Sequence, residues 1–331
     1  MATWERVLGL FGIGGLTRSP QPVTGGWSHN VWRVSTAGGE FAIKEMVHNP
    51  QPWWTEQITA AINFELRAWG NGGIPMAEPI SDAAGDYLPF VATDGWTQRY
   101  RCHRWVAGRP CVDEPPSVER SRQVGATVAK LVNLDVPGGS TRTDLAWNAL
   151  EAYEATVTEA KARRLDWAPL LADLRSGVDQ LRAQFDELAD RDLPMLFLHR
   201  DLDPRNTARG ADGELVVFDW DYAGPRLVAS ELLTAALSFA GGAADGDDQC
   251  VVATFDSYLA TAAPVDFRGA APPLAEEAFR WMMLNAWRAL GHRGASPEQA
   301  EFAGSLVRSL ASTWLDLRAS LERWEAALTA G

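Results

Sequence analysis

The second half of the chain has a mainly helical pattern that two short apolar runs of β-type residues interrupt. These runs are Met195–Leu198 and Leu215–Phe218, and each is followed by a loop that contains aspartate. Around them, Ala, Leu, Glu and Arg recur at helical spacing, which predicts helices over 117–134, 144–163, 168–189 and within 228–331. The fold must therefore place a small β insert, with carboxylates at its ends, in a body of helices.

The first hundred residues have a different pattern. Alternating residues within 22–48 predict two strands joined by a turn at Ala37–Glu40. Apolar spacing predicts a helix over 53–70, ended by the glycines that follow it. Further short strands are predicted at 77–80, 87–92 and 96–103. The chain thus begins as a small sheet with one helix.

Length and composition exclude several classes of protein. The 331 residues suggest two domains or lobes, and the formal net charge of −13 argues against a nucleic-acid partner and suits a neutral or cationic ligand. Three cysteines without a CxxC pair argue against a disulfide scaffold or a zinc ribbon and for a reducing compartment. No apolar stretch approaches the roughly 18 residues of a membrane helix, and the N-terminus has no basic leader. We therefore expect a cytoplasmic protein without a membrane partner.

Lysine is rare, and one lysine lies in an unusual setting. The only lysines are Lys44, Lys130 and Lys161, and Lys44 follows the apolar residues Phe-Ala-Ile of a predicted strand. Burying an amine is costly unless it is paired. A lysine that contacts nucleotide phosphates and is held by a helix glutamate meets this need, with Glu65 as the preferred partner and Glu56 as the alternative. The competing interpretation is a solvated lysine on an edge strand.

A glycine-containing loop precedes this strand. In Gly25-Gly-Trp-Ser-His-Asn30 the glycines allow backbone amides to approach phosphate oxygens, and the serine hydroxyl adds a donor. Alone, this segment is more typical of a β-turn without a ligand.

Two motifs follow the apolar runs of the second half. The first motif, His199-Arg-Asp-Leu-Asp-Pro-Arg-Asn206, matches the H-x-D-x-x-x-x-N catalytic loop of kinases. In that loop Asp201 would orient or accept the proton of the substrate hydroxyl, and Asn206 would bind magnesium. Asp219 ends the second run, thirteen residues after Asn206, and a carboxylate there suits a hard cation such as Mg²⁺. Either motif singly is compatible with a polar loop, but their order after the glycine loop and Lys44 favours a kinase.

On these residues, over roughly 20–240, the chain resembles the aminoglycoside phosphotransferase and choline kinase superfamily, the small-molecule relatives of protein kinases. The resemblance implies an α+β, two-lobed protein-kinase-like fold. A small sheet-plus-helix N-lobe would cover 1–103, a hinge 104–108, and a large, mainly helical C-lobe 109–331.

The resemblance also implies roles for single residues. ATP or GTP would be held, with Mg²⁺, by the loop residues Gly26, Ser28 and Asn30, by Lys44 with Glu65, by the backbone of Arg104 and Val106, and by the metal ligands Asn206 and Asp219, with Asp201 as catalytic base. Arg200, Asp203, Arg205 and Glu231 depart from the family pattern. These departures weaken any transfer of substrate identity.

Several residues are candidates for contact with the acceptor, each with a structural alternative. Asp203 would contact a cationic substrate or hydrogen-bond its own loop, and Asp221 is a further acidic candidate. Trp281 and Trp287, with Asn285 between them, would line a cleft or belong to the core.

The expected function is O-phosphorylation of a small hydroxylated molecule, neutral or cationic, by a monomer or homodimer. An antibiotic of aminoglycoside, peptide or nucleoside type is favoured, by analogy. The alternatives are a metabolic kinase for an amino alcohol, sugar or homoserine-like acceptor, and an inactive nucleotide-binding pseudokinase. A pseudokinase would be expected to lack Lys44, Asp201, Asn206 or Asp219, and all four are present.

Other classes fit less well. Only Trp220–Ser230 separates Asp219 from Glu231, which leaves no room for the activation loop of a protein kinase. No lysine follows a glycine, so a P-loop is excluded. A transition-metal site at His199, Asp201 and Asp203 explains the loop less well than the kinase motif does.

Overall fold

The computed structural model describes residues 4–23, 29–46, 52–93, 96–141, 152–292 and 296–330. The chain divides into two compact units, each built from two separate segments. The first unit combines Met1–Pro115 with His199–Gly224, and the second combines Pro116–Leu198 with Pro225–Gly331. The expected class, α+β with an antiparallel sheet and many helices, is confirmed.

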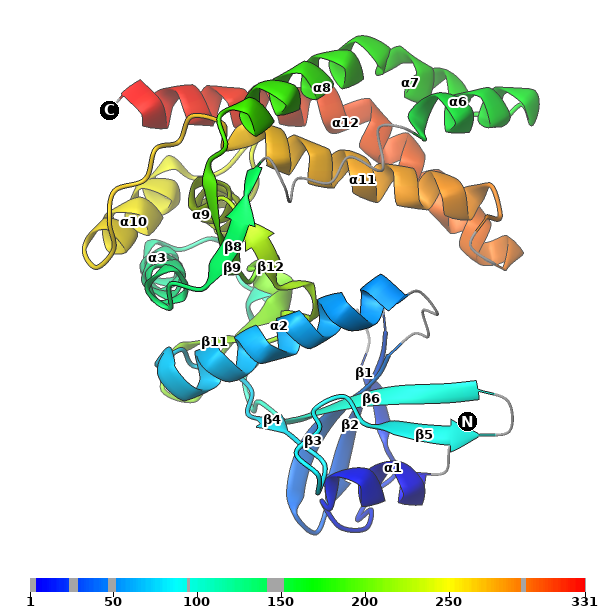
Figure 1. Ribbon diagram of the computed structural model, residues 1–331, viewed down its shortest axis with the longest axis vertical. Helices are drawn as coiled ribbons and strands as arrows, with labels where there is room; N and C mark the ends of the chain where they lie inside the picture. Colours follow the sequence, from blue (N-terminus) through cyan, green and yellow to red (C-terminus); the bar gives the residue numbers. More distant parts are fainter. Residues whose placement is uncertain are drawn as a thin grey trace. The chain divides into compact units, whose positions relative to one another are not determined.

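The first unit is built on an antiparallel sheet in the order β1-β2-β3-β6-β4, with β5 paired to β6 (Figure 1). Its strands are β1 (Gln21–Val23), β2 (Asn30–Thr36), β3 (Gly39–Glu45), β4 (Pro79–Ile80), β5 (Phe90–Thr93) and β6 (Trp96–Arg104). Strands β2 and β3 form the predicted hairpin, in which Thr36 pairs with Gly39. Gly39 has a φ of +123°, a conformation that favours glycine at this turn.

The predicted helix over 53–70 is confirmed as α2 (Pro52–Asn71). Ile58 and Ile62, one turn apart, are buried against Met46, which follows β3, and against Leu88. This packing fixes the helix that carries Glu65 beside the end of β3.

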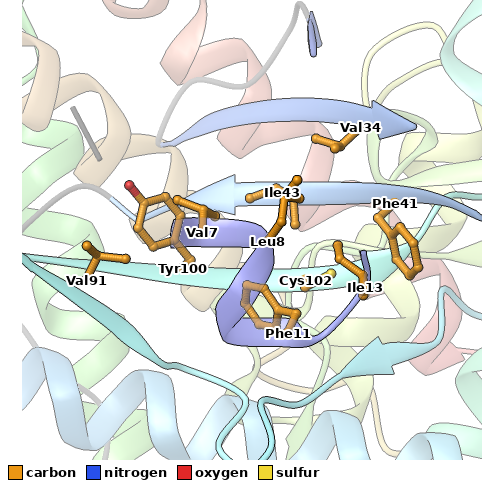
Figure 2. Packing of buried hydrophobic residues seen from close by; sticks show 10 residues of the cluster. All are labelled: Val7, Leu8, Phe11, Ile13, Val34, Phe41, Ile43, Val91, Tyr100 and Cys102. Atoms are coloured by element: carbon orange, nitrogen blue, oxygen red, sulfur yellow. The ribbon is translucent and has the colours of Figure 1, made fainter. Parts of the chain in front are cut away.

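A short helix that the sequence did not predict, α1 (Trp4–Phe11), covers one face of this sheet. Figure 2 shows Val7, Leu8 and Phe11 of α1 among sheet residues that include Phe41 and Tyr100. The three α1 side chains recur at i, i+1 and i+4, which buries one face of the helix in this hydrophobic core.

The segment after His199 belongs to the first unit because it pairs with strands there. Strands β11 (Leu215–Val217) and β10 (Thr207–Arg209) form a sheet with β7 (Arg109–Pro110) in the order β11-β10-β7. The second predicted apolar run is thus confirmed as β11. The described part of the unit also contains short 3₁₀ turns: η1 (Cys111–Asp113), η2 (Pro204–Asn206) and η3 (Trp220–Tyr222). The lobe boundaries expected from the sequence stay a prediction, since the compact units divide the chain elsewhere.

The second unit is mainly helical. Its helices are α3 (Val118–Asn133), α6 (Tyr153–Ala162), α7 (Ala168–Asp173), α8 (Arg175–Asp190), α9 (Val228–Ala240), α10 (Asp248–Leu259), α11 (Ala271–Ala289) and α12 (Pro297–Ala330). Helix α3 packs on α10 and α9, and α11 packs on α12 and α8 (Figure 1). The helix predicted over 168–189 is divided near Leu174 into α7 and α8, and the one predicted over 144–163 is seen as α6 in its described part.

A small sheet lies among these helices. It has the order β12-β9-β8, formed by β12 (Gly224–Arg226), β9 (Pro194–Leu198) and β8 (Pro137–Ser140). Strand β9 confirms the first predicted apolar run. Among the residues described, no helix is long and apolar enough to cross a membrane.

Candidate active site

The loop after β9 holds Asp201 and Asn206 in direct contact. The Asn206 side-chain amide donates to the Asp201 carboxylate at 2.7 Å and to the Asp201 carbonyl at 2.9 Å. At the start of the loop, the Asp201 amide donates to Nδ1 of the buried His199 at 3.3 Å. The aspartate and asparagine that the motif identifies are therefore in direct contact in this loop.

Asp203 shapes this loop from within. Its carboxylate accepts from the Arg205 amide at 2.6 Å, from the Arg205 Nε at 2.9 Å and from the Asn206 amide at 3.3 Å, and so caps η2. Asp203 is 7% exposed. The structure thus favours the loop role of Asp203 over the substrate contact that was its alternative, because both carboxylate oxygens are already bonded.

The surroundings of Asp201 alter its acidity. Burial raises the pKa of Asp201 to about 6, and the neighbouring carboxylates of Asp203 and Asp219 act in the same direction. A carboxyl with a pKa near the working pH can both accept and release a proton, which suits a general base.

The pairing of β10 with β11 places Asp219 beside Asn206. Thr207 pairs with Val217, and the Phe218 amide donates to the Asn206 carbonyl at 3.0 Å. Asp219 then follows at the end of the strand with a φ of +64°, a left-handed conformation that is uncommon for aspartate and is tolerated where surrounding contacts impose it.

This arrangement fits a magnesium ion. The Nδ2 of Asn206 is bonded to Asp201, so the amide oxygen is its remaining acceptor, and the Asp219 carboxylate is 40% exposed. Mg²⁺ prefers such oxygen ligands and usually completes its shell with phosphates and water. Within the described part of the chain, no group of three or more His, Cys, Asp or Glu side chains is arranged to hold a metal. A site with two protein ligands does not require one.

Lys44 points to the same strand end, but with partners the sequence did not predict. Its amine donates to Asp219 at 2.6 Å and to Asp221 at 2.5 Å. These two carboxylates raise the pKa of Lys44 despite its burial. Lys44, Asp201 and Asp219 thus converge in the first unit, as the predicted reaction requires.

The predicted pair between Lys44 and Glu65 is not formed among the described residues, and this expectation is corrected. Glu65 is fully buried and binds the guanidinium of Arg101, while its other oxygen lies 2.9 Å from Nε2 of His103. The Arg101 guanidinium and the hydrogen bond with His103 lower the pKa of Glu65 against the effect of its burial. The alternative partner, Glu56, is exposed on α2.

The surroundings of Asp221 favour a role within the fold over the substrate contact predicted for it, and that contact stays a prediction. Its side chain is 11% exposed, and it binds Lys44 and Arg101 and lies 3.9 Å from Nε2 of His29. Two adjacent cations hold the pKa of Asp221 far below its usual range. Because these ion pairs occupy both carboxylate oxygens, Asp221 has little capacity left to bind a substrate.

Arg101 and His103 are the site residues that sequence reasoning missed. Both lie on β6, where Arg101 is directly opposite Lys44 of β3. The signal in the sequence was charged residues at alternate positions, Arg99, Arg101 and His103, in a strand whose other residues include the buried Tyr100 and Cys102.

The remaining predicted nucleotide contacts are partly described. Gly26 and Ser28 lie outside the described residues, and Asn30 donates its side-chain amide to Glu45 at 3.1 Å. At the predicted hinge, the Arg104 amide donates to the Glu78 carbonyl at 2.8 Å, and the contact of Arg104 with a nucleotide base stays a prediction. Val106 follows the end of β6 and is half-buried.

The predicted acceptor residues of α11 lie in the second unit and are used in packing. Asn285 is 1% exposed and donates to the Trp281 carbonyl at 2.8 Å. The Trp287 indole donates to the Thr156 hydroxyl of α6 at 3.0 Å. These contacts favour the core alternative for Asn285, whereas a role of Trp281 and Trp287 toward a substrate stays a prediction.

A family model matches most of the chain. Residues 19–273 match the model of a family described as the phosphotransferase enzyme family. No curated protein matches the sequence of the chain.

Solved structures share the fold at low sequence identity. A spectinomycin phosphotransferase solved with ADP and spectinomycin superposes with a TM-score of 0.63 at 12% identity, covering 96% of this chain and 97% of the other. An amicoumacin kinase solved with AMP-PNP, Ca²⁺ and its ligand gives 0.60 at 14%, covering 95% and 94%. A microcompartment-associated aminopropanol kinase also gives 0.60 at 14%, covering 98% of both chains. These likenesses show a common fold and leave the acceptor undetermined.

Proposed function

Since the chain belongs to the phosphotransferase enzyme family, we propose that it transfers the terminal phosphoryl group of a magnesium-bound ATP or GTP to a hydroxyl of a small molecule. The observation that carries this proposal is the convergence of Lys44, Asp201 and Asp219 in one unit, with Asn206 bonded to Asp201. Each of these residue types has a defined use in phosphoryl transfer.

Each of these residues has its own role in the proposed phosphoryl transfer. Lys44 binds phosphate oxygens, and Asn206 and Asp219 would hold Mg²⁺, which supplies positive charge to the phosphates. Asp201 orients the acceptor hydroxyl and accepts its proton as the new oxygen–phosphorus bond forms. The bond from the γ-phosphorus to the bridging oxygen breaks, and the nucleoside diphosphate leaves with that electron pair.

We favour an antibiotic as the acceptor. The net charge of −13 suits a cationic acceptor, and two similar structures are antibiotic kinases. A metabolic kinase is the second candidate, because the aminopropanol kinase is as similar as the amicoumacin kinase. Both candidates use the same residues and differ only in the acceptor.

The test is a coupled assay of ADP or GDP release over a panel of aminoglycosides, peptide and nucleoside antibiotics, amino alcohols and sugars. The wild-type protein should turn over one acceptor class with ATP or GTP, and Asp201→Ala should lower kcat by about 10²–10⁴-fold. Asp212→Ala, an exposed aspartate between β10 and β11, is the matched control and should leave turnover unchanged. Full turnover by the Asp201→Ala variant would contradict the assignment of the base.

A further inference from the structure

Arg101 is a buried cation next to Lys44 that the phosphotransfer motifs do not use. It pairs directly across the β3–β6 ladder with Lys44 and is 2% exposed. Like charges opposite each other in a sheet repel, and burying each of them is costly without a counter-charge. The fold must therefore supply carboxylates at this position.

Asp221 and Glu65 supply them from two different elements. One guanidinium nitrogen of Arg101 donates to Asp221, which follows β11, and the other donates to Glu65 of α2. Asp221 in turn accepts from Lys44 at 2.5 Å. A continuous path of charged contacts thus leads from α2 through Arg101 and Asp221 to the Lys44 amine.

The two carboxylates that contact Lys44 differ in their surroundings. Asp219 is 40% exposed and is the proposed magnesium ligand, whereas Asp221 is 11% exposed. A carboxylate that binds a metal gives up much of its attraction for an amine, so Asp221 is the one that continues to hold Lys44 when the nucleotide is bound. The position of Asp221 depends in turn on Arg101.

We propose that Arg101 is a positioning residue, which binds Glu65 and Asp221 together and so fixes the carboxylate that aligns Lys44 with the nucleotide phosphates. It takes the place of the direct Glu65–Lys44 pair that the sequence predicts. The role requires arginine, because its planar fork binds two carboxylates at once and a lysine amine does not reproduce that geometry. The inference rests on the proposed function.

The test uses Arg101→Lys, Arg101→Met and the double variant Glu65→Gln/Arg101→Met. The double variant removes one charge of each sign and so avoids an unpaired Glu65 in the interior. Arg99→Met is the matched control, since Arg99 lies on the same strand and its side chain donates to the Leu88 carbonyl instead of the cluster. Three quantities are measured: the urea midpoint, the affinity for Mg-ATP and Mg-GTP by titration calorimetry, and the labelling rate of the Lys44 amine by mass spectrometry.

We expect Arg101→Lys and the double variant to bind the preferred nucleotide about tenfold or more weakly while remaining folded. Lys44 labelling should rise several-fold relative to Lys130 and Lys161, two exposed lysines that serve as internal standards. The Arg99→Met variant should match the wild type in nucleotide affinity and labelling.

A double variant with wild-type nucleotide affinity and wild-type Lys44 labelling would overturn the inference and leave Arg101 a structural role only. If the wild-type protein binds neither nucleotide, the proposed function fails. In that case unchanged labelling of Lys44 in the variants still overturns the positioning role, and increased labelling supports the contact path on its own.

Discussion

At the scale of single residues, the surroundings of Asp201 disfavour its ionised form and so give the carboxyl a pKa that suits proton transfer. Burial and the carboxylates of Asp203 and Asp219 oppose its ionisation, while Asn206 donates a hydrogen bond that favours it. The balance is a pKa of about 6, above the ordinary value of 3.8. The folded chain therefore binds the Asp201 proton more tightly than the unfolded chain does.

This difference predicts how stability depends on pH. Above pH 6 the ionised Asp201 destabilises the fold in full, and below about pH 4 the penalty vanishes, because the carboxyl is then protonated in both states. Asp201→Asn removes the charge and keeps an acceptor for Asn206. It should raise the free energy of unfolding by about 1–3 kcal/mol at pH 8 and by little at pH 4. Urea unfolding of the nucleotide-free protein in EDTA measures this.

Asp212→Asn serves as the control for that series. Asp212 is exposed, so its loss should change stability little at either pH. An Asp201→Asn variant that loses stability at pH 8 would show that contacts made by the charged carboxylate outweigh its burial.

Which residues could be read from the sequence depended on how far apart the partners lie along it. Asp201 and Asn206 share one loop, so the motif alone identified both residues, and the structure adds their contact. Lys44 was identified by its rarity and its strand, but its partner was wrong. Arg101 is its neighbour only through the register of β3 and β6, and that register is not visible in residue spacing.

At the scale of elements, the sequence predicted helices better than their contacts. The helix predicted over 117–134 is α3 (Val118–Asn133), but nothing in its spacing showed that Gly125 is where it meets α10. Helix α1 was missed because its apolar run is short, and the residues that bury it belong to strands elsewhere in the sequence. Packing partners thus decide features that periodicity alone leaves open.

The contact at Gly125 gives a prediction for these elements. A Cβ added to Gly125 would lie 2.0 Å from the backbone carbonyl oxygen of Thr254, so α3 and α10 would have to separate. Gly125→Ala should lower the free energy of unfolding by about 1–3 kcal/mol or more. Gly9→Ala in α1 meets nothing within 4 Å and should raise it by up to about 1 kcal/mol, because alanine favours helix.

Urea midpoints of the two variants measure the contrast. Equal effects of the two substitutions would show that helix propensity decides both, and that the close approach of α3 to Thr254 is not maintained in solution.

At the scale of the whole molecule, the order of motifs predicted the fold class, while the composition of the compact units was not predictable. The segment His199–Gly224 joins the N-terminal residues because the three-residue strand β10 pairs with the two-residue strand β7. Strands this short show no recognisable pattern in the sequence. As a result, Lys44, Asp201, Asn206 and Asp219 all lie in the first unit. A ligand that binds all four would tie together its two separate chain segments.

A ligand that binds the folded chain and not the unfolded chain should therefore stabilise the fold by mass action. At 100 times its Kd, a magnesium nucleotide should raise the free energy of unfolding by about 2.7 kcal/mol and increase Tm measurably. The increase should need ATP or GTP together with Mg²⁺ and should be reversed by EDTA. Because Asp219 contributes one of the two proposed metal ligands, Asp219→Asn should lose most of the magnesium-dependent part, whereas the exposed Asp212→Asn should keep it. Thermal unfolding followed by tryptophan fluorescence measures the shift, and an equal shift in EDTA, or in Asp219→Asn, would refute the assignment of Asp219 as a metal ligand.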